Sequence, residues 1–174
     1  TINEDEEFKL NLFASDAEGD PLTYGATVDG NAKVNVFNNE LTISPYKNYN
    51  GPIKVTLAVS DGEDTDETNF ILNVKPINDA PVLLSINPIS SSIKNQVDLT
   101  LDATDIDGDK LSYTVKGGPN TTFDIKDNRI IVSPQKDYNG STPIKLTTSD
   151  GSSNVDTSFT LINPMPGVTA FAPE

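Results

Sequence analysis

The sequence predicts an all-β fold made of two tandem β-sandwich domains that follow one another in an extended arrangement. Apolar and polar residues alternate in short runs, which is the period of a half-buried β-strand. No stretch of the chain has a convincing helical period. An internal repeat divides the 174 residues into two halves, and such a repeat is the first pattern to consider in assigning a fold.

The two copies of the repeat are separated by a constant spacing of 89 residues. The repeated segments are Asp16–Asp20 and Asp105–Asp109, Ser44-Pro45 and Ser133-Pro134, Tyr49–Gly51 and Tyr138–Gly140, and Ser60–Gly62 and Ser149–Gly151. The spacing never changes, so no insertion separates the copies, and each half is long enough for a modest core. We therefore expect one domain at residues 1–78 and a second at 79–174, which ends in a Pro-rich tail from Pro164.

Alternating apolar residues mark at least four strands in each copy. In the first copy they are Phe8, Leu10 and Leu12; Leu41 and Ile43; Val55, Leu57 and Val59; and Phe70, Leu72 and Val74. Gly, Asn, Asp and Pro interrupt the runs at short intervals, as turns require. Several short strands in a domain of this size favour a β-sandwich of the immunoglobulin-like type. The chain has no Cys and no Trp, so this prediction concerns the architecture and not the antibody family.

Composition excludes several classes of function. Acidic residues outnumber basic ones 26 to 12, and the net charge of −14 disfavours nucleic acid and anionic membrane surfaces as partners. The charge favours cations, although it could also serve only solubility. The absence of Cys and His excludes disulfides, thiolate metal sites and Ser-His-Asp catalysis. No apolar run is long enough to span a bilayer, so we expect no direct membrane insertion. The chain begins at Thr1 without a signal peptide, and we expect a fragment of a longer protein.

Two loops are rich in carboxylates. Asp105, Asp107 and Asp109 stand in one loop, and Asp16, Glu18 and Asp20 are their counterparts in the first copy. Ca²⁺ binds several hard oxygen ligands, and a cation would remove the repulsion within each cluster. The glycine comes fourth and not sixth, so these loops are not EF-hands. An ordinary turn remains the alternative, because Asp and Gly both favour turns. The same two interpretations apply to Asp61 and Asp150 in the Ser-Asp-Gly segments.

The segment between the copies has the character of a stiff linker. Asn78 and Asp79 offer oxygen atoms, and Pro81 restricts its own φ and pushes Ala80 towards an extended conformation. A cation that neutralised the acids would stiffen this segment further. The sequence therefore predicts a calcium-rigidified joint. The acidic run Glu4–Glu7 precedes the first strand, and on its pattern alone such a run is most often solvated.

With these motifs the chain resembles a pair of cadherin-like repeats from large bacterial surface proteins and adhesins. The motifs are Asn3-Glu4-Asp5, the two acidic loops with the following Leu-x-Tyr, Ser-Pro before Tyr-Asn-Gly, Ser-Asp-Gly, and Asn78–Pro81. The resemblance implies a secreted or cell-surface location and calcium between consecutive repeats. The implied ligands are Glu4, Asn78, Asp79, Asp105, Asp107 and Asp150, with Asp109 in the same loop. Asp16, Glu18, Asp20 and Asp61 would belong to a second site shared with a neighbouring repeat of the same chain.

These observations leave three interpretations of function. The first is a non-enzymatic extender that calcium makes rigid and that holds another region away from a surface. The second is a module that binds carbohydrate or protein, for which Tyr46 is the aromatic residue that the second copy replaces, with Gln135. The third is a glycosidase with paired carboxylates. Because the carboxylates are duplicated at one spacing, they suit a repeated structural site better than a single active site.

Overall fold

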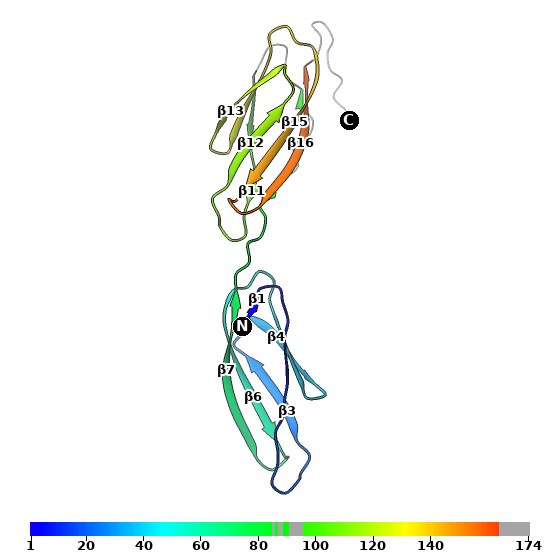
Figure 1. Cartoon of the computed structure of the whole chain (residues 1–174), viewed down its shortest axis with the longest axis vertical. Coiled ribbons are helices and arrows are strands. Elements are labelled where there is room, and N and C mark those ends of the chain that lie inside the picture. The colour runs from blue at the N-terminus through cyan, green and yellow to red at the C-terminus, as the bar shows by residue number, and fades with distance from the viewer. Residues whose placement is uncertain (85, 87–88, 91–95, 164–174) are drawn as a thin grey trace. The chain divides into compact units, whose positions relative to one another are not determined.

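The structure, a computed structural model, describes residues 1–84, 86, 89–90 and 96–163. The chain divides into two compact units, Thr1–Ile77 (unit 1) and Asn78–Glu174 (unit 2). Every regular element in the described part is a β-strand, which confirms the all-β prediction (Figure 1). None of the described residues lies in a helix that could cross a membrane. The predicted Pro-rich tail from Pro164 lies outside the described residues.

Unit 1 consists of two sheets. Its strands are β1 (Ile2–Asn3), β2 (Phe8–Asn11), β3 (Thr23–Val28), β4 (Ala32–Phe37), β5 (Glu40–Pro45), β6 (Gly51–Ser60) and β7 (Thr65–Lys75). One sheet has the order β1-β7-β6-β3 and the other the order β2-β5-β4. β1 runs parallel to β7, and all other pairs are antiparallel.

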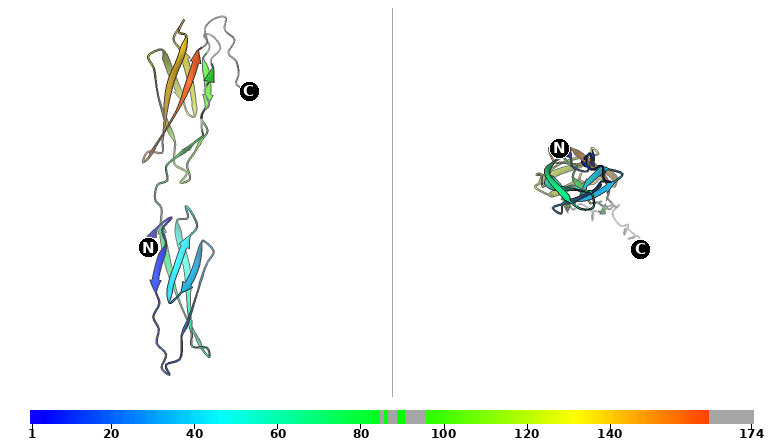
Figure 2. Two further views of the ribbon diagram at one scale, coloured as in Figure 1. Left: turned by 90° about the vertical axis from the view of Figure 1, so that its right-hand side faces the viewer. Right: turned by 90° about the horizontal axis from the view of Figure 1, so that it is seen from below.

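Unit 2 repeats this arrangement and adds a short strand pair. Its strands are β8 (Val82–Leu83), β9 (Ile89–Ser90), β10 (Val97–Thr100), β11 (Ala103–Thr104), β12 (Ser112–Gly117), β13 (Thr121–Lys126), β14 (Arg129–Pro134), β15 (Gly140–Ser149) and β16 (Asn154–Asn163). The two main sheets have the orders β12-β15-β16-β9 and β10-β14-β13, and β11 pairs with β8. β15 and β16 form the longest antiparallel pair of the unit and lie side by side in both views (Figures 1 and 2).

Each unit has its own apolar core between its two main sheets. The buried apolar residues of unit 1 are Leu12, Ala32, Leu41, Ile43, Ile53, Val55, Leu72 and Val74. Those of unit 2 are Leu101, Ile130, Val132, Ile144, Leu146, Phe159 and Leu161. In β6, Ile53 and Val55 face inward while Lys54 is exposed, as the period of two predicts. The two immunoglobulin-like sandwiches predicted from the alternation are therefore confirmed.

The repeated Tyr-Asn-Gly segment fixes the turn that enters β6 and β15. The Tyr49 hydroxyl donates a hydrogen bond to the carbonyl of Pro52 at 2.8 Å, and the Tyr138 hydroxyl donates to the carbonyl of Ser141 at 3.2 Å. Gly51 has φ of 136°, and a Cβ atom there would lie 3.0 Å from the Tyr49 hydroxyl oxygen. A glycine is needed at this position for both reasons. These tyrosines hold a turn and pack against their own unit, which explains why both copies contain them.

Candidate metal centre

The acidic loop of unit 2 is held by the first of its three aspartates. Asp105 Oδ1 accepts the backbone amides of Asp107 at 2.9 Å and Asp109 at 3.2 Å. Gly108 has φ of 79°, a conformation that glycine adopts at little cost. The turn brings Asp105, Asp107 and Asp109 together, so that one carboxylate oxygen from each lies within 4.8 Å of the others. The loop is thus a turn of the predicted kind that also gathers three carboxylates.

The second oxygen of Asp105 has no such role. Asp105 Oδ2 is buried and has no hydrogen-bond partner among the described residues. A buried acceptor without a partner costs free energy, and the cost is larger when the group is charged. A hard cation would satisfy this oxygen, and the donor set of the loop consists of carboxylate oxygens, which Ca²⁺ prefers. The residues present therefore fit a calcium ion.

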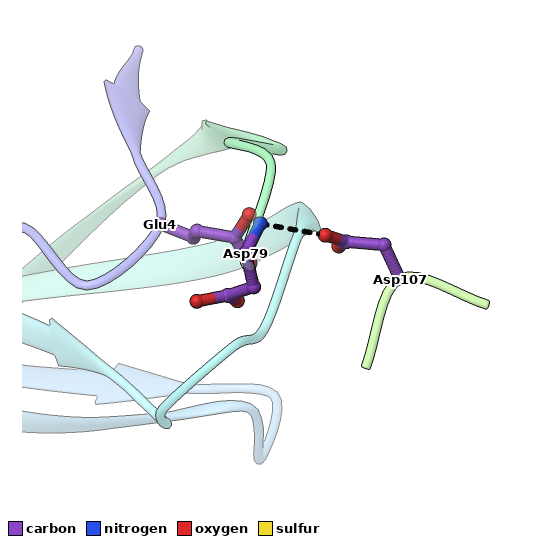
Figure 3. Close-up of side chains that lie close together, drawn as sticks. All are labelled: Glu4, Asp79 and Asp107. Atoms are coloured by element: carbon purple, nitrogen blue, oxygen red, sulfur yellow. Dashed lines mark hydrogen bonds between the residues drawn. The ribbon is translucent and has the colours of Figure 1, made fainter. Parts of the chain in front are cut away.

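The first residues of unit 2 are fastened to its acidic loops. The Asp79 amide donates to Asp107 Oδ2 at 2.8 Å, the bond drawn in Figure 3. The Asn78 side-chain amide donates to Asp150 Oδ2 at 3.0 Å and to Ser153 Oγ at 3.2 Å. Asn78 was expected to offer its oxygen, and in the structure its nitrogen faces Asp150. The sequence interpretation did not include Ser153, although the repeat spacing pairs it with the acidic Asp64.

Asp150 is a buried carboxylate held by backbone amides. Its Oδ1 accepts the amides of Ser152 at 2.6 Å and Ser153 at 2.5 Å, and its residue exposure is 9%. The Ser153 amide is the main cause that keeps the pKa of the Asp150 carboxyl below its ordinary value of 3.8, with smaller help from Asn78 and Ser152. Burial acts in the opposite direction and does not reverse the shift. Asp150 is therefore an anion at neutral pH, with Oδ1 used by the turn.

The acidic loop of unit 1 has the same turn. Asp16 Oδ1 accepts the amides of Glu18, Gly19 and Asp20 at 2.9, 2.7 and 2.9 Å. Across the described residues, Asp16, Glu18 and Asp20 do not form a three-carboxylate group as tight as the one in unit 2. The first copy therefore has the turn of the predicted site without the same convergence of oxygens.

Asp61 lies beside this loop of unit 1. Asp16 and Asp61 line one cavity of about 280 Å³, together with Asp64 and Asp66. Asp61 Oδ1 accepts the amides of Glu63 at 2.8 Å and Asp64 at 2.7 Å. The Asp64 amide first, and then the Glu63 amide, hold the pKa of the Asp61 carboxyl below its ordinary value of 3.8. The sequence interpretation did not include Asp64 and Asp66, which add to the negative charge of the cavity.

Glu4 is buried in unit 1, although the residues after it in the acidic run are exposed. It follows β1, is 5% exposed, and donates its amide to the Lys75 carbonyl at 2.9 Å. Its Oε1 accepts the amide of Ile77 at 2.5 Å. The expectation of a solvated run is therefore wrong for Glu4, because β1 pairs with β7 and places this carboxylate where the chain leaves the strand.

Fold and site together define a class: a pair of tandem immunoglobulin-like, cadherin-like sandwiches of the extracellular, adhesion type. The model of the bacterial Ig domain family matches residues 1–73 and again residues 78–163. The chain belongs to the bacterial Ig domain family and contains two copies of the domain. Domains of this family occur in extracellular or surface proteins.

Three individual proteins are similar to the chain. Chitinase A of Pseudoalteromonas piscicida is 27% identical over 154 residues, which cover 84% of this chain and 18% of that protein. The human protocadherin-24 EC1-2 structure is 19% identical with a TM-score of 0.57, covering 95% of this chain and 93% of that one, a likeness of fold. The endo-fucoidan hydrolase MfFcnA4 is 20% identical with a TM-score of 0.40, covering 94% of this chain and 27% of that one. The chain thus spans less than a third of both hydrolases.

The amide bonds to Asp61 predict how acid affects unit 1. Because its folded-state pKa is depressed, Asp61 stabilises unit 1 above its ordinary pKa, and this contribution is lost as the pH falls through the folded value. The Asp61→Asn variant keeps an Oδ1 acceptor but cannot titrate, so we expect its unfolding midpoint to change less with pH below about 4. Urea unfolding at several pH values, with the exposed neighbour Glu63→Gln as the control, measures this. Equal acid dependence in the two variants would contradict it.

Proposed function

We propose that this chain is a calcium-binding, non-enzymatic extender of a bacterial cell-surface or secreted protein. In this proposal Ca²⁺ binds beside the linker and stiffens the joint between consecutive repeats. The observation that carries it is the buried, unpartnered Oδ2 of Asp105 in a loop that also presents Asp107 and Asp109. The net charge of −14 supports a cation as the ligand.

The linker connects this loop to both units through bonds within each. Asp79 and Asn78 are tied to Asp107 and Asp150 in unit 2. In unit 1, Glu4 accepts the amide of Ile77, the residue that is peptide-bonded to Asn78. A cation held by the unit 2 carboxylates would restrict Asn78 and Asp79, and Glu4 is the residue by which unit 1 would respond. Asp16, Glu18, Asp20 and Asp61 are proposed as part of a second site, shared with a neighbouring repeat.

The expected affinity is modest and sets what binding can accomplish. Extracellular calcium modules have dissociation constants of about 10⁻⁴ to 10⁻³ M. At an ion concentration ten times that constant, one site stabilises the bound form by about 1.4 kcal/mol. This energy is small compared with the stability of a folded domain, which is roughly 5–15 kcal/mol. Calcium would therefore govern the orientation of the joint more than the survival of either sandwich.

Calorimetry of the whole chain tests the site itself. We expect Ca²⁺ uptake with a dissociation constant of about 10⁻⁴ to 10⁻³ M, weakened at least tenfold in Asp105→Asn and in Asp107→Asn because each loses a charged ligand. Asn at position 105 can still accept the amides of the turn, so the loop should stay folded. Asp124→Asn, an exposed aspartate on β13, is the matched control and should bind normally. Absence of uptake, or equal affinity in Asp105→Asn and the control, would overturn the site.

Spin labels test the extender. The chain has no cysteine, so Lys33→Cys in unit 1 and Asp124→Cys in unit 2 give two unique, exposed labelling positions. We expect Ca²⁺ to narrow the distribution of distances between the labels, and EDTA to broaden it, while the β circular dichroism of both units stays unchanged. In Asp107→Asn the narrowing should disappear. A distribution that does not respond to Ca²⁺ would contradict the rigid joint even if the ion binds.

A second candidate function is a carbohydrate- or protein-binding module that mediates adhesion. It is favoured by the likeness to a protein named chitinase A, of which this chain would be an accessory domain. Tyr46 is 49% exposed in unit 1, and an exposed aromatic ring suits stacking on a sugar. Its counterpart in unit 2 is Gln135, so the aromatic surface is specific to one copy.

A glycan array and a chitin pull-down distinguish the two candidates. If the chain is a carbohydrate module, Tyr46→Ala should abolish retention on the saccharide, because the stacking surface is lost. Phe37→Ala, which removes another exposed aromatic residue of unit 1, is the control and should leave retention unchanged. Failure of the unmodified chain to bind any saccharide would eliminate the carbohydrate function and leave the extender.

A further inference from the structure

The cores of the two units can be compared residue by residue, because the repeat spacing is constant. Three apolar core positions of unit 1 have buried counterparts in unit 2. The pairs are Leu57 and Leu146, Val59 and Thr148, and Phe70 and Phe159. The three residues of unit 2 are only 0%, 0% and 5% exposed, whereas the three of unit 1 are all partly exposed. Unit 1 is therefore open on a side where unit 2 is closed.

In unit 2 a short extended segment closes this side. β8 pairs antiparallel with β11, with Leu83 opposite Ala103, and the Leu84 amide donates to the Asp102 carbonyl at 3.1 Å. Leu83 and Ile86 pack against the buried core of the unit. Backbone pairing and apolar side chains together explain why the core beneath is shielded from water.

Unit 1 has the receiving backbone without the strand. The counterparts of β11 are Ala14 and Ser15, which are exposed and pair with no described strand. The adjacent Phe13 is 89% exposed. A cavity of about 110 Å³ lies here, and its wall includes Leu12, Phe13, Ala14, Tyr24 and Leu57. Residues 66–68 of β7 line its other side.

We propose that this groove is a strand-acceptor site, and that its occupant is an extended apolar segment of the β8 kind. The occupant would run antiparallel to Phe13–Ser15 and place one apolar side chain over Leu57 and Val59, as Leu83 and Ile86 cover the core of unit 2. An unpaired backbone beside an apolar groove is the arrangement that binds strands: hydrogen bonds supply affinity, and alternate side chains supply specificity. The donor to which we commit is a segment joined to unit 1 on its N-terminal side, because β8 stands in that relation to unit 2.

A graft tests the acceptor site within the whole chain. A copy of Ala80–Ile89 joined directly before Thr1 places the copied Leu83 as far from Ala14 as Leu83 is from Ala103. We expect hydrogen exchange at residues 13–15 to slow by about tenfold or more, because these amides and their neighbours become paired. The unfolding midpoint of unit 1 should rise by roughly 4 °C or more.

The matched control is the same extension with Leu83→Asp and Ile86→Asp in the copied segment. It has the same length and spacing but cannot fill an apolar groove, so it should leave exchange and unfolding as in the unextended chain. Equal protection by both extensions, or by neither, would overturn the proposal. Addition of the free ten-residue peptide tests the source. Protection by the free peptide that the joined copy does not reproduce would overturn the assignment to an N-terminally joined donor.

Discussion

The acidic loops depend on one constraint: a carboxylate that holds a turn has only its other oxygen left for a ligand. In both units the first aspartate of the loop spends Oδ1 on two or three backbone amides. This fixes the turn and orients the side chain without any ion. In unit 2 the fixed orientation buries Asp105 Oδ2 without a partner among the described residues. Turn and metal site are therefore not competing interpretations of these loops, because the turn is what aims the free oxygen.

The sequence predicted what depends on local period and on the repeat. Alternation identified the core faces of β5, β6 and β7, since Ile43, Val55 and Leu72 are buried in the unit that surrounds them. It could not predict that Leu57 is only partly covered, because its cover would come from a strand elsewhere in the chain. Charge pattern likewise gave Glu4 as solvated, whereas strand pairing buries it. Such tertiary effects have no signal in a local window.

The repeat also shows which positions the fold requires and which are free to differ. Tyr49 and Tyr138 serve the same turn in both copies, with the same hydroxyl-to-carbonyl bond three residues later. Phe13 and Tyr46 are exposed in unit 1, and unit 2 has Asp102 and Gln135 in their places. Since these side chains are mostly outside the core, the sandwich does not need them. Differences between the copies therefore point to surfaces with a separate role, and unit 1 carries more of them.

The open groove and the acidic cavity of unit 1 share part of their walls. Ala14, Val59 and Asp66 line both of them. A strand seated along Phe13–Ser15 would therefore also cover one side of the cavity that contains Asp16 and Asp61. Covering a carboxylate removes water from it and raises the cost of its charge, and a bound cation lowers that cost. Strand insertion and cation binding in unit 1 should consequently strengthen each other, whereas in unit 2 the strand is already in place and the carboxylates of its loop already converge.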